Sequence, residues 1–162
     1  MKVADLVTVA HIAAVVGVVS VLVAMGATAA ALRGVREQLR LQVFLEFTRR
    51  YNELVLDLPE GARDPRVDPD TVSRIDPAAL RRFARGYFNL CSEEHFLQRQ
   101  KKIEPTIWSI WCSGIDNVLR LSWLRSLWGE LRVEYEPYRE FADFMDERVA
   151  QAGNAELSTR SG

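Results

Sequence analysis

The sequence has little cysteine, histidine and lysine, and it lacks the glycine-rich motifs that hold phosphate groups. No G-x-x-x-x-G-K-[ST], G-x-G-x-x-G or G-x-S-x-G pattern occurs, so a phosphate-cradling loop is not expected. The two cysteines, Cys91 and Cys112, form no C-x-x-C pair and are too few for a disulfide framework, which favours reduced thiols. The 21 Lys and Arg residues nearly balance the 22 Asp and Glu residues, so charge gives no reason to expect nucleic-acid binding.

The scarcity of metal-ligating and nucleophilic residues also limits the chemistry of the chain. Cys91 and His95 lie four residues apart and would share a helix face. Glu94, with Cys112 from the next helix, would complete a conceivable zinc shell, but structural zinc usually has two well-spaced ligand pairs. We therefore predict no metal, no cofactor and no catalytic residue. An enzyme that uses Cys91 and His95 is the weaker alternative, because no third group that would orient the histidine is evident.

One long segment has no formal charge: residues 6–32 contain no Asp, Glu, Lys or Arg. A helix of this length covers roughly 40 Å, more than the roughly 30 Å hydrocarbon core of a bilayer, and it would have no polar face. We therefore predict a transmembrane anchor in residues 1–32. A cleaved signal peptide is the main alternative, since Ala27-Thr28-Ala29 resembles a cleavage site, but the apolar run is longer than that of a typical signal peptide.

Basic residues are concentrated after the apolar segment. Arg33, Arg36 and Arg40 follow it, whereas Lys2 precedes it and is opposed by Asp5. Because the more basic flank of a span stays in the cytoplasm, we expect the N-terminus to face outwards and the rest of the chain to be cytosolic. This orientation places the three arginines beside the lipid headgroups of the inner membrane.

Small residues recur at helical spacing within the apolar segment. Gly26, Ala30 and Gly34 follow one another at intervals of four, and Gly17 stands four residues after Ala13. Such small-xxx-small patterns let two membrane helices approach closely, so Gly17, Gly26, Ala30 and Gly34 are the predicted packing positions of a self-associating span. Alanine is abundant in this segment, and chance spacing is the alternative interpretation.

Residues 33–58 predict a juxtamembrane helix that belongs to the cytosolic domain. Apolar residues recur there at steps of three and four, with no proline before Pro59. The members of this stripe are Leu39, Val43, Phe47, Tyr51, Leu54 and Leu58. Further apolar residues widen the stripe, so the helix either packs deep in its own domain or also meets a second protomer.

The remainder is predicted to be a helical bundle at residues 77–150. Residues 59–76, rich in proline and aspartate, predict an exposed loop, and the small, polar residues 151–162 predict a disordered tail. The expected starts of four further helices are Asp76-Pro77, Glu104-Pro105, Ser122 and Pro137. No stretch alternates with period two, so the predicted fold is all-α: a transmembrane helix continuous with a four- to five-helix cytosolic bundle.

Two further features are open to more than one interpretation. The four tryptophans, Trp108, Trp111, Trp123 and Trp128, are more often a bulky core at this spacing than a hot spot for a partner. Residues 81–102 carry a net charge of +4 and residues 130–147 one of −5. Complementary packing of these stretches is one explanation, and recruitment of the basic stretch to anionic lipid is the other.

Two stretches, QVFLEFTRRYNELVLDLP and RGYFNLCSEEHF, carry a family resemblance. Together they resemble a widespread group of bacterial membrane-anchored helical proteins of unknown function, over roughly residues 38–147. The resemblance implies a bacterial inner-membrane setting and a helical domain, and it transfers no catalytic residue.

The sequence therefore favours a membrane-anchored, non-enzymatic interaction module, whose partners are the bilayer and either an unknown protein or a second copy of the chain. A membrane-acting effector or channel-like oligomer is the alternative. Its pore would need a continuous polar stripe, which the available residues do not form. Those residues are Thr8, His11, Ser20 and Thr28.

Overall fold

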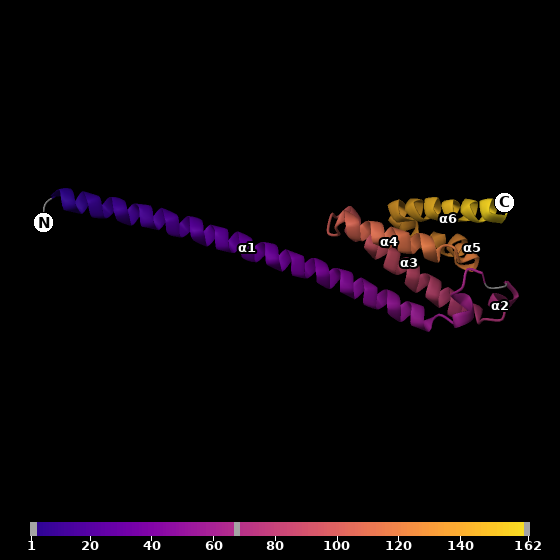
Figure 1. Ribbon diagram of the computed structural model, residues 1–162. Helices are drawn as coiled ribbons and strands as arrows, with labels where there is room; N and C mark the ends of the chain where they lie inside the picture. The colour runs from indigo at the N-terminus through magenta and orange to yellow at the C-terminus, as the bar shows by residue number, and fades with distance from the viewer. Residues whose placement is uncertain (1–2, 67–68, 161–162) are drawn as a thin grey trace. The chain divides into compact units, whose positions relative to one another are not determined.

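The computed structural model describes the backbone of residues 3–66 and 69–160, and the side chains of residues 16–66 and 70–155. Lys2 lies outside the described backbone, and Asp5, Thr8, His11 and Ala13 lie outside the described side chains. All regular secondary structure in the described chain is helical, as predicted, and no strand occurs there (Figure 1). It divides into two units, residues 1–43 and residues 44–162.

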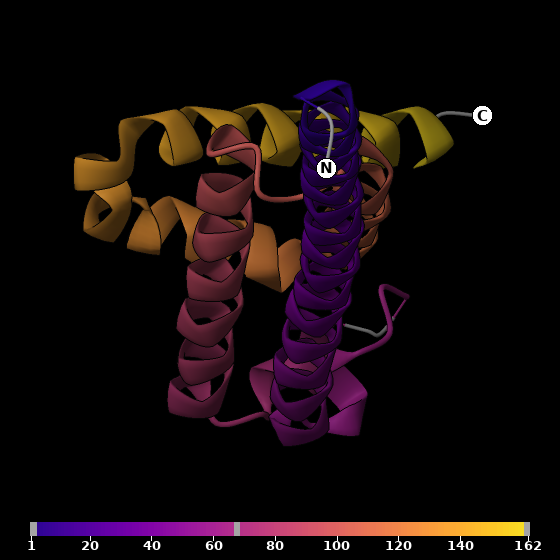
Figure 2. The same cartoon turned by 90° about the vertical axis from the view of Figure 1, so that its left-hand side faces the viewer.

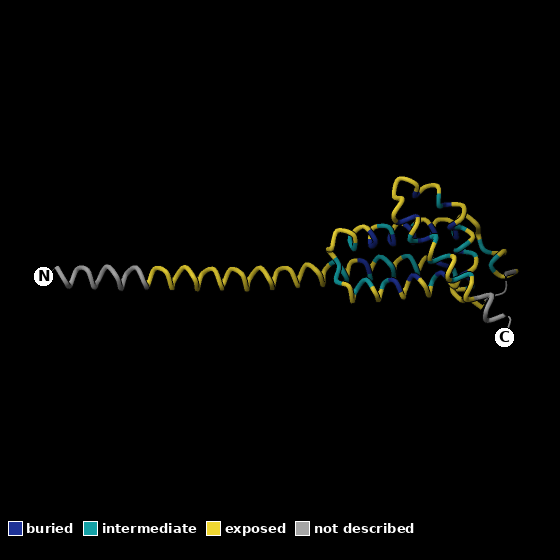
Figure 3. The backbone as a smooth tube through the Cα atoms, turned by 90° about the horizontal axis from the view of Figure 1, so that it is seen from above, coloured by how far each residue is buried: buried dark blue, intermediate teal, exposed yellow. Residues whose placement is uncertain are grey.

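The first unit consists of the N-terminal part of α1, a helix that extends over Val3–Asp57. Every side chain from Val16 to Gln42 is exposed (Figure 3). The candidate span is long and apolar enough to cross a bilayer, with a mean hydropathy of 1.8 in an 18-residue window, none of it buried. A signal sequence passes the same test of length and composition.

The second unit is a helical bundle that starts with the C-terminal end of α1. Its further elements are η1 (Glu60–Ala62), α2 (Pro69–Ser73), α3 (Pro77–Arg99), α4 (Pro105–Val118), α5 (Ser122–Leu131), η2 (Arg132–Tyr138) and α6 (Arg139–Arg160). Figure 2 shows that α6, in yellow, runs across the direction of α3, in rose. The largest fully buried side chains come from α3 to α6 and the turns between them: Phe88, Leu90, Cys91, Leu119, Leu124, Leu131 and Met145.

Local capping explains where α3 and α4 begin. The Asp76 side chain accepts a hydrogen bond from the Ala78 N–H at 3.0 Å, and Pro77 occupies the first turn, where its missing N–H has no cost. Pro105 opens α4 in the same way, after Glu104 in an extended conformation. Both starts agree with the sequence prediction.

Four details differ from the prediction. Ser122 begins α5 but does not cap it, because the N-cap is Leu121 and no side chain bonds there. Pro137 lies inside the 3₁₀ segment η2, and the α-helix begins two residues later, at Arg139. The expected disordered tail from residue 151 is instead a continuation of α6 to Arg160, because Ala152 still packs against the core. The expected loop 59–76 also contains the short helices η1 and α2.

The basic and acidic stretches pair with each other. Arg85 bonds Glu134 at 2.7 Å and Arg99 bonds Glu140 at 2.9 Å, so two contacts join α3 to η2 and α6. A third ion pair joins Arg81 in α3 to Glu130 in α5. All of these groups are exposed, where ion pairs add little stability. The charge asymmetry in the sequence therefore reflects complementary helix packing.

Candidate functional site

Aromatic contacts bring the end of α1 against α3 and α4. The rings of Phe47 and Trp111 lie 5.1 Å apart between centroids, and those of Tyr51 and Tyr87 lie 6.4 Å apart. Phe44 stacks on Trp111 with nearly parallel planes, at 6.5 Å. Aromatic pairs at these separations stabilise packing beyond the area they bury. Aromatic rings from all three helices therefore pack against one another at this junction.

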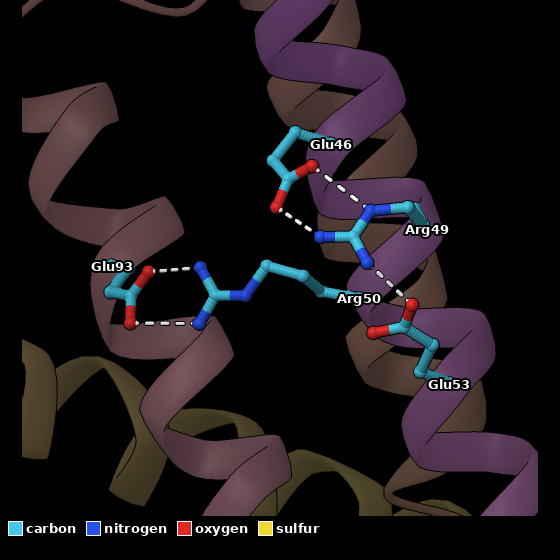
Figure 4. A network of polar contacts seen from close by, with 5 residues as sticks. All are labelled: Glu46, Arg49, Arg50, Glu53 and Glu93. Carbon is cyan, nitrogen blue, oxygen red and sulfur yellow. Dashed lines mark hydrogen bonds and ion pairs between the residues drawn. The ribbon is translucent and has the colours of Figure 1, made fainter.

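Ion pairs reinforce this junction on its exposed side, as Figure 4 shows. The two terminal nitrogens of the Arg50 guanidinium donate to the two carboxylate oxygens of Glu93, which ties α1 to α3. Arg49, one residue earlier, bonds Glu46 and Glu53 on its own helix. The neighbouring arginines thus have different functions, because one joins two helices and the other stabilises a single helix.

A cavity of about 180 Å³ lies at the junction. Each of the three helices contributes residues to its lining. These are Phe47, Thr48 and Tyr51 from α1, Tyr87, Leu90, Cys91 and Glu94 from α3, and Ile110, Trp111, Gly114 and Ile115 from α4. We refer to it as the Glu94 cavity, because Glu94 supplies the carboxyl group in a lining that is mostly aromatic and aliphatic.

Glu94 is unusual among the acidic residues, since its side chain is only 7% exposed. The adjacent Glu93 is exposed and held by Arg50, so the two carboxylates point to different sides of α3, as adjacent helical residues must. No hydrogen bond or ion pair to Glu94 is found in the described part of the chain, and because no fully buried side-chain oxygen or nitrogen there lacks a partner, its oxygens face the open side of the cavity. Burial raises its pKa to about 8, against the smaller opposite effect of Arg50. The carboxyl group is therefore largely protonated at neutral pH when the cavity holds no cation.

Cys91 and His95 differ in their surroundings. Burial raises the pKa of the Cys91 thiol well above its usual value, which removes its nucleophilic form. His95 lies among the rings of Trp108, Phe141 and Phe144, at 5.0 to 6.1 Å between centroids. Burial lowers its pKa, so it is neutral. Cys91 is therefore a buried thiol, and His95 is a buried imidazole packed between aromatic rings.

No three His, Cys, Asp or Glu side chains gather to hold a metal ion in the described part of the chain. A larger cavity of about 470 Å³ lies beside α4 and α6, with Asp116 and Arg125 in its lining. Asp116 bonds Arg148 at 2.6 Å, and Arg125 donates to the Leu119 carbonyl at 2.6 Å. Because these groups already have partners within the chain, the Glu94 cavity is the stronger candidate.

The tryptophans named by sequence all have partners within the domain. Trp128 is buried and donates to the Asp146 carboxylate at 2.8 Å, and Trp123 donates to the Ala62 carbonyl at 3.1 Å. Trp108 packs on Phe144, and Trp111 packs on Phe47. The packing interpretation therefore accounts for all four, and only Trp111 also lines the Glu94 cavity.

The predicted membrane positions lie on exposed parts of α1. Gly17, Gly26 and Gly34 have open space around them, since an added Cβ would meet no other atom within 4 Å in the described part of the chain. Gly26, Ala30 and Gly34 share one side of the helix, but Gly17 is about two and a half turns before Gly26 and faces the opposite way. The four positions therefore do not form one packing face.

Sequence reasoning missed the Glu94 cavity. One signal was available, because Glu94 falls on the apolar stripe of α3 that Leu80, Phe83, Tyr87 and Leu90 define. A carboxylate on the core side of a helix indicates either a buried partner or a site.

Comparisons with protein-family models, with curated proteins and with solved structures find no match for this chain. The resemblance to bacterial membrane-anchored helical proteins therefore stays a prediction.

Proposed function

We propose that this protein is a membrane-anchored, non-enzymatic helical interaction module of the bacterial inner membrane. The observation that carries the proposal is the first part of α1, an uncharged and fully exposed helix from Val16 to Leu32. In water this surface would be unfavourable at roughly 25 cal/mol for each Å² of apolar area, and lipid removes that cost.

The basic residues that follow support an orientation with the bundle in the cytoplasm. Arg33, Arg36 and Arg40 are exposed and lie on one side of α1, because they are three and four residues apart. A row of this kind suits anionic headgroups at the cytoplasmic surface.

Binding is favoured over catalysis by the state of the reactive groups. The Cys91 thiol is buried and protonated, and the neutral His95 ring packs among aromatic side chains. Cys91 lines the Glu94 cavity, but its thiol is held in the protonated form, which is not nucleophilic. The domain is therefore proposed to bind its partner, a protein or a second copy of the chain, close to the bilayer, where tethering raises the effective concentration.

The channel-like alternative has weaker support. The Ser20 hydroxyl donates to the Val16 carbonyl and the Thr28 hydroxyl to the Ala24 carbonyl, each at 2.8 Å. Both hydroxyls are thus bonded within their own helix, as is common for such residues in lipid. Thr8 and His11 lie outside the described side chains.

Membrane extraction combined with intact mass tests the proposal. The full-length protein is expected to stay in the pellet after alkaline carbonate washing and to keep the 18.4 kDa mass of the whole chain. A reporter fused to the C-terminus is expected to be active only in the cytoplasm. Release by carbonate would contradict the anchor, and a mass that lacks the first 29 or so residues would indicate a cleaved signal peptide.

A further inference from the structure

The Glu94 cavity has a polar group that the fold itself does not use. Glu94 is more than nine-tenths buried and lines the cavity, and no hydrogen bond or ion pair holds it in the described part of the chain. Since no fully buried side-chain oxygen or nitrogen of the described residues lacks a partner, the Glu94 carboxyl oxygens face the open side of the cavity, where a ligand can reach them. The nearest cation, Arg50, is bonded at both of its terminal nitrogens to Glu93.

We propose that the Glu94 cavity binds an organic ammonium ion of about the size of choline, whose charge is met by the Glu94 carboxylate and the surrounding aromatic rings. Phe47, Tyr51, Tyr87 and Trp111 all line the cavity. Aromatic rings attract cations through their negatively charged faces, and cages of such rings are how proteins bind quaternary ammonium groups. This inference does not depend on whether the domain also binds a protein partner.

The size of the cavity limits the ligand. About 180 Å³ is the space of roughly six water molecules at liquid density. Choline, with about seven non-hydrogen atoms, is of this size, whereas drug-sized ligands and nucleotides fill cavities of roughly 300 to 1,000 Å³.

The chemistry of the lining excludes other small ligands. An anion would find no Lys or Arg among the described residues of the lining. A neutral apolar molecule would leave the carboxyl group without a partner. A hard metal ion needs several oxygen ligands, and no suitable group of three is present among the described residues.

Glu94 must lose its proton to meet the cation. The titratable and charged groups around it come from all three helices: Arg50, Tyr51, Tyr87, Cys91, Glu93 and Cys112. Burial raises the pKa of Glu94 to about 8, and a bound ammonium would lower it. Binding is therefore expected to release a proton and to tighten as the pH rises from about 6 to about 9.

Calorimetric titration of the full-length protein in a non-ionic detergent tests the proposal. Choline chloride is compared with 3,3-dimethylbutan-1-ol, a neutral molecule of the same shape, at constant ionic strength. We expect choline to bind at least about tenfold more tightly, and Glu94→Gln to abolish the preference. Equal binding of the two compounds, tighter binding of the neutral one, or no binding of choline would overturn the proposal.

Two glycine variants locate the binding site. Gly114 lines the cavity and Gly129 does not, and an added Cβ at either meets no described atom within 4 Å. Gly114→Leu is thus expected to fill the cavity and abolish choline binding without disturbing the fold, whereas Gly129→Leu is expected to bind as the original chain does. Loss of binding in both variants, or in neither, would contradict the location.

The ammonium group could come from a free metabolite or from a lipid headgroup. A short-chain phosphatidylcholine below its micellar concentration separates the two sources. Tighter binding than choline indicates a headgroup, and binding of choline alone indicates a free ammonium compound. Both results keep the proposal, provided that the neutral compound binds more weakly.

Discussion

A Cβ atom added to Gly86 would lie 2.6 Å from Cδ2 of Leu54, closer than non-bonded carbon atoms approach. The absence of a side chain at Gly86 therefore allows α3 to lie directly against the end of α1. This contact brings Tyr51 to Tyr87 and Arg50 to Glu93, and so forms one side of the Glu94 cavity.

Enlarging Gly86 is expected to separate the two helices. Gly86→Leu should lower the free energy of unfolding by on the order of 1–3 kcal/mol, as overpacking usually does. Leu54→Ala in the same chain should recover part of the loss, because the shorter side chain leaves room. Thermal unfolding of the full-length protein in detergent, followed by circular dichroism, measures both effects.

Gly129→Leu is the matched control for this prediction. Gly129 is also helical, but it has open space around it, so leucine there removes the helix penalty of glycine and should preserve or raise stability. Equal destabilisation by both leucine variants would show that the contact with Leu54 is not the cause.

The buried Glu94 predicts a stability that falls as the pH rises. Its pKa is about 8 in the folded chain, against an ordinary value of 4.5, so the folded state binds the extra proton between these values. The contribution of Glu94 to stability is thus greatest below about pH 4.5 and decreases as the pH rises from there to about 8. Glu94→Gln should therefore gain stability relative to the original chain as the pH rises.

Melting curves of both chains at several pH values check this prediction. Any cost of the amide that does not depend on pH cancels when the differences are compared. A constant difference between the two chains from pH 5 to about pH 9 would mean that Glu94 is ionised in the folded state.

His95 predicts a loss of stability in acid. Burial lowers its pKa below the ordinary 6.5, so in mild acid His95 is protonated in the unfolded chain but still neutral in the folded chain. The stability present above about pH 6.5 is lost as the pH falls from there through the lowered pKa. His95→Phe, which keeps a ring beside Trp108 and Phe144, should reduce the acid sensitivity. Melting temperatures of both chains between about pH 5 and pH 7 would reveal it, and parallel curves would contradict it.

If the span self-associates, a larger side chain is expected to weaken the dimer only when it lies on the packing face. A Cβ added at Gly26 meets no described atom within 4 Å, so a loss of dimer in Gly26→Leu is expected to come from contact with a second chain. Ala24→Leu, off the face that Gly26 shares with Ala30 and Gly34, is the control. We expect energy transfer between labelled chains in vesicles to fall for Gly26→Leu alone. Unchanged transfer would remove Gly26 from the interface.

Much of the fold follows from local sequence. Asp76-Pro77 and Pro105 predict helix starts because capping and the missing proline N–H act within one turn. Pro137 misled the prediction, because a 3₁₀ segment precedes α6 and contains it. Helical structure to Arg160 was also not predicted, since the packing of Ala152 on the core depends on residues far away in the chain.

The candidate site was less predictable. Cys91, His95 and Glu94 were singled out together, yet only Cys91 and Glu94 line the cavity, whereas His95 lies in an aromatic cluster. Helical spacing places residues on a common face, but it does not say which neighbours that face meets.

The sequence alone determined that the first helix suits a bilayer, because a long segment without charge has no polar side to turn towards water. It also determined the all-α class, since apolar residues recur at the helical period. Only the tertiary structure decided that Glu93 is an ion-pair residue and Glu94 a buried, protonated one. The pKa of a carboxyl group depends on the water and charges that surround it, and here three helices, distant in sequence, supply those surroundings.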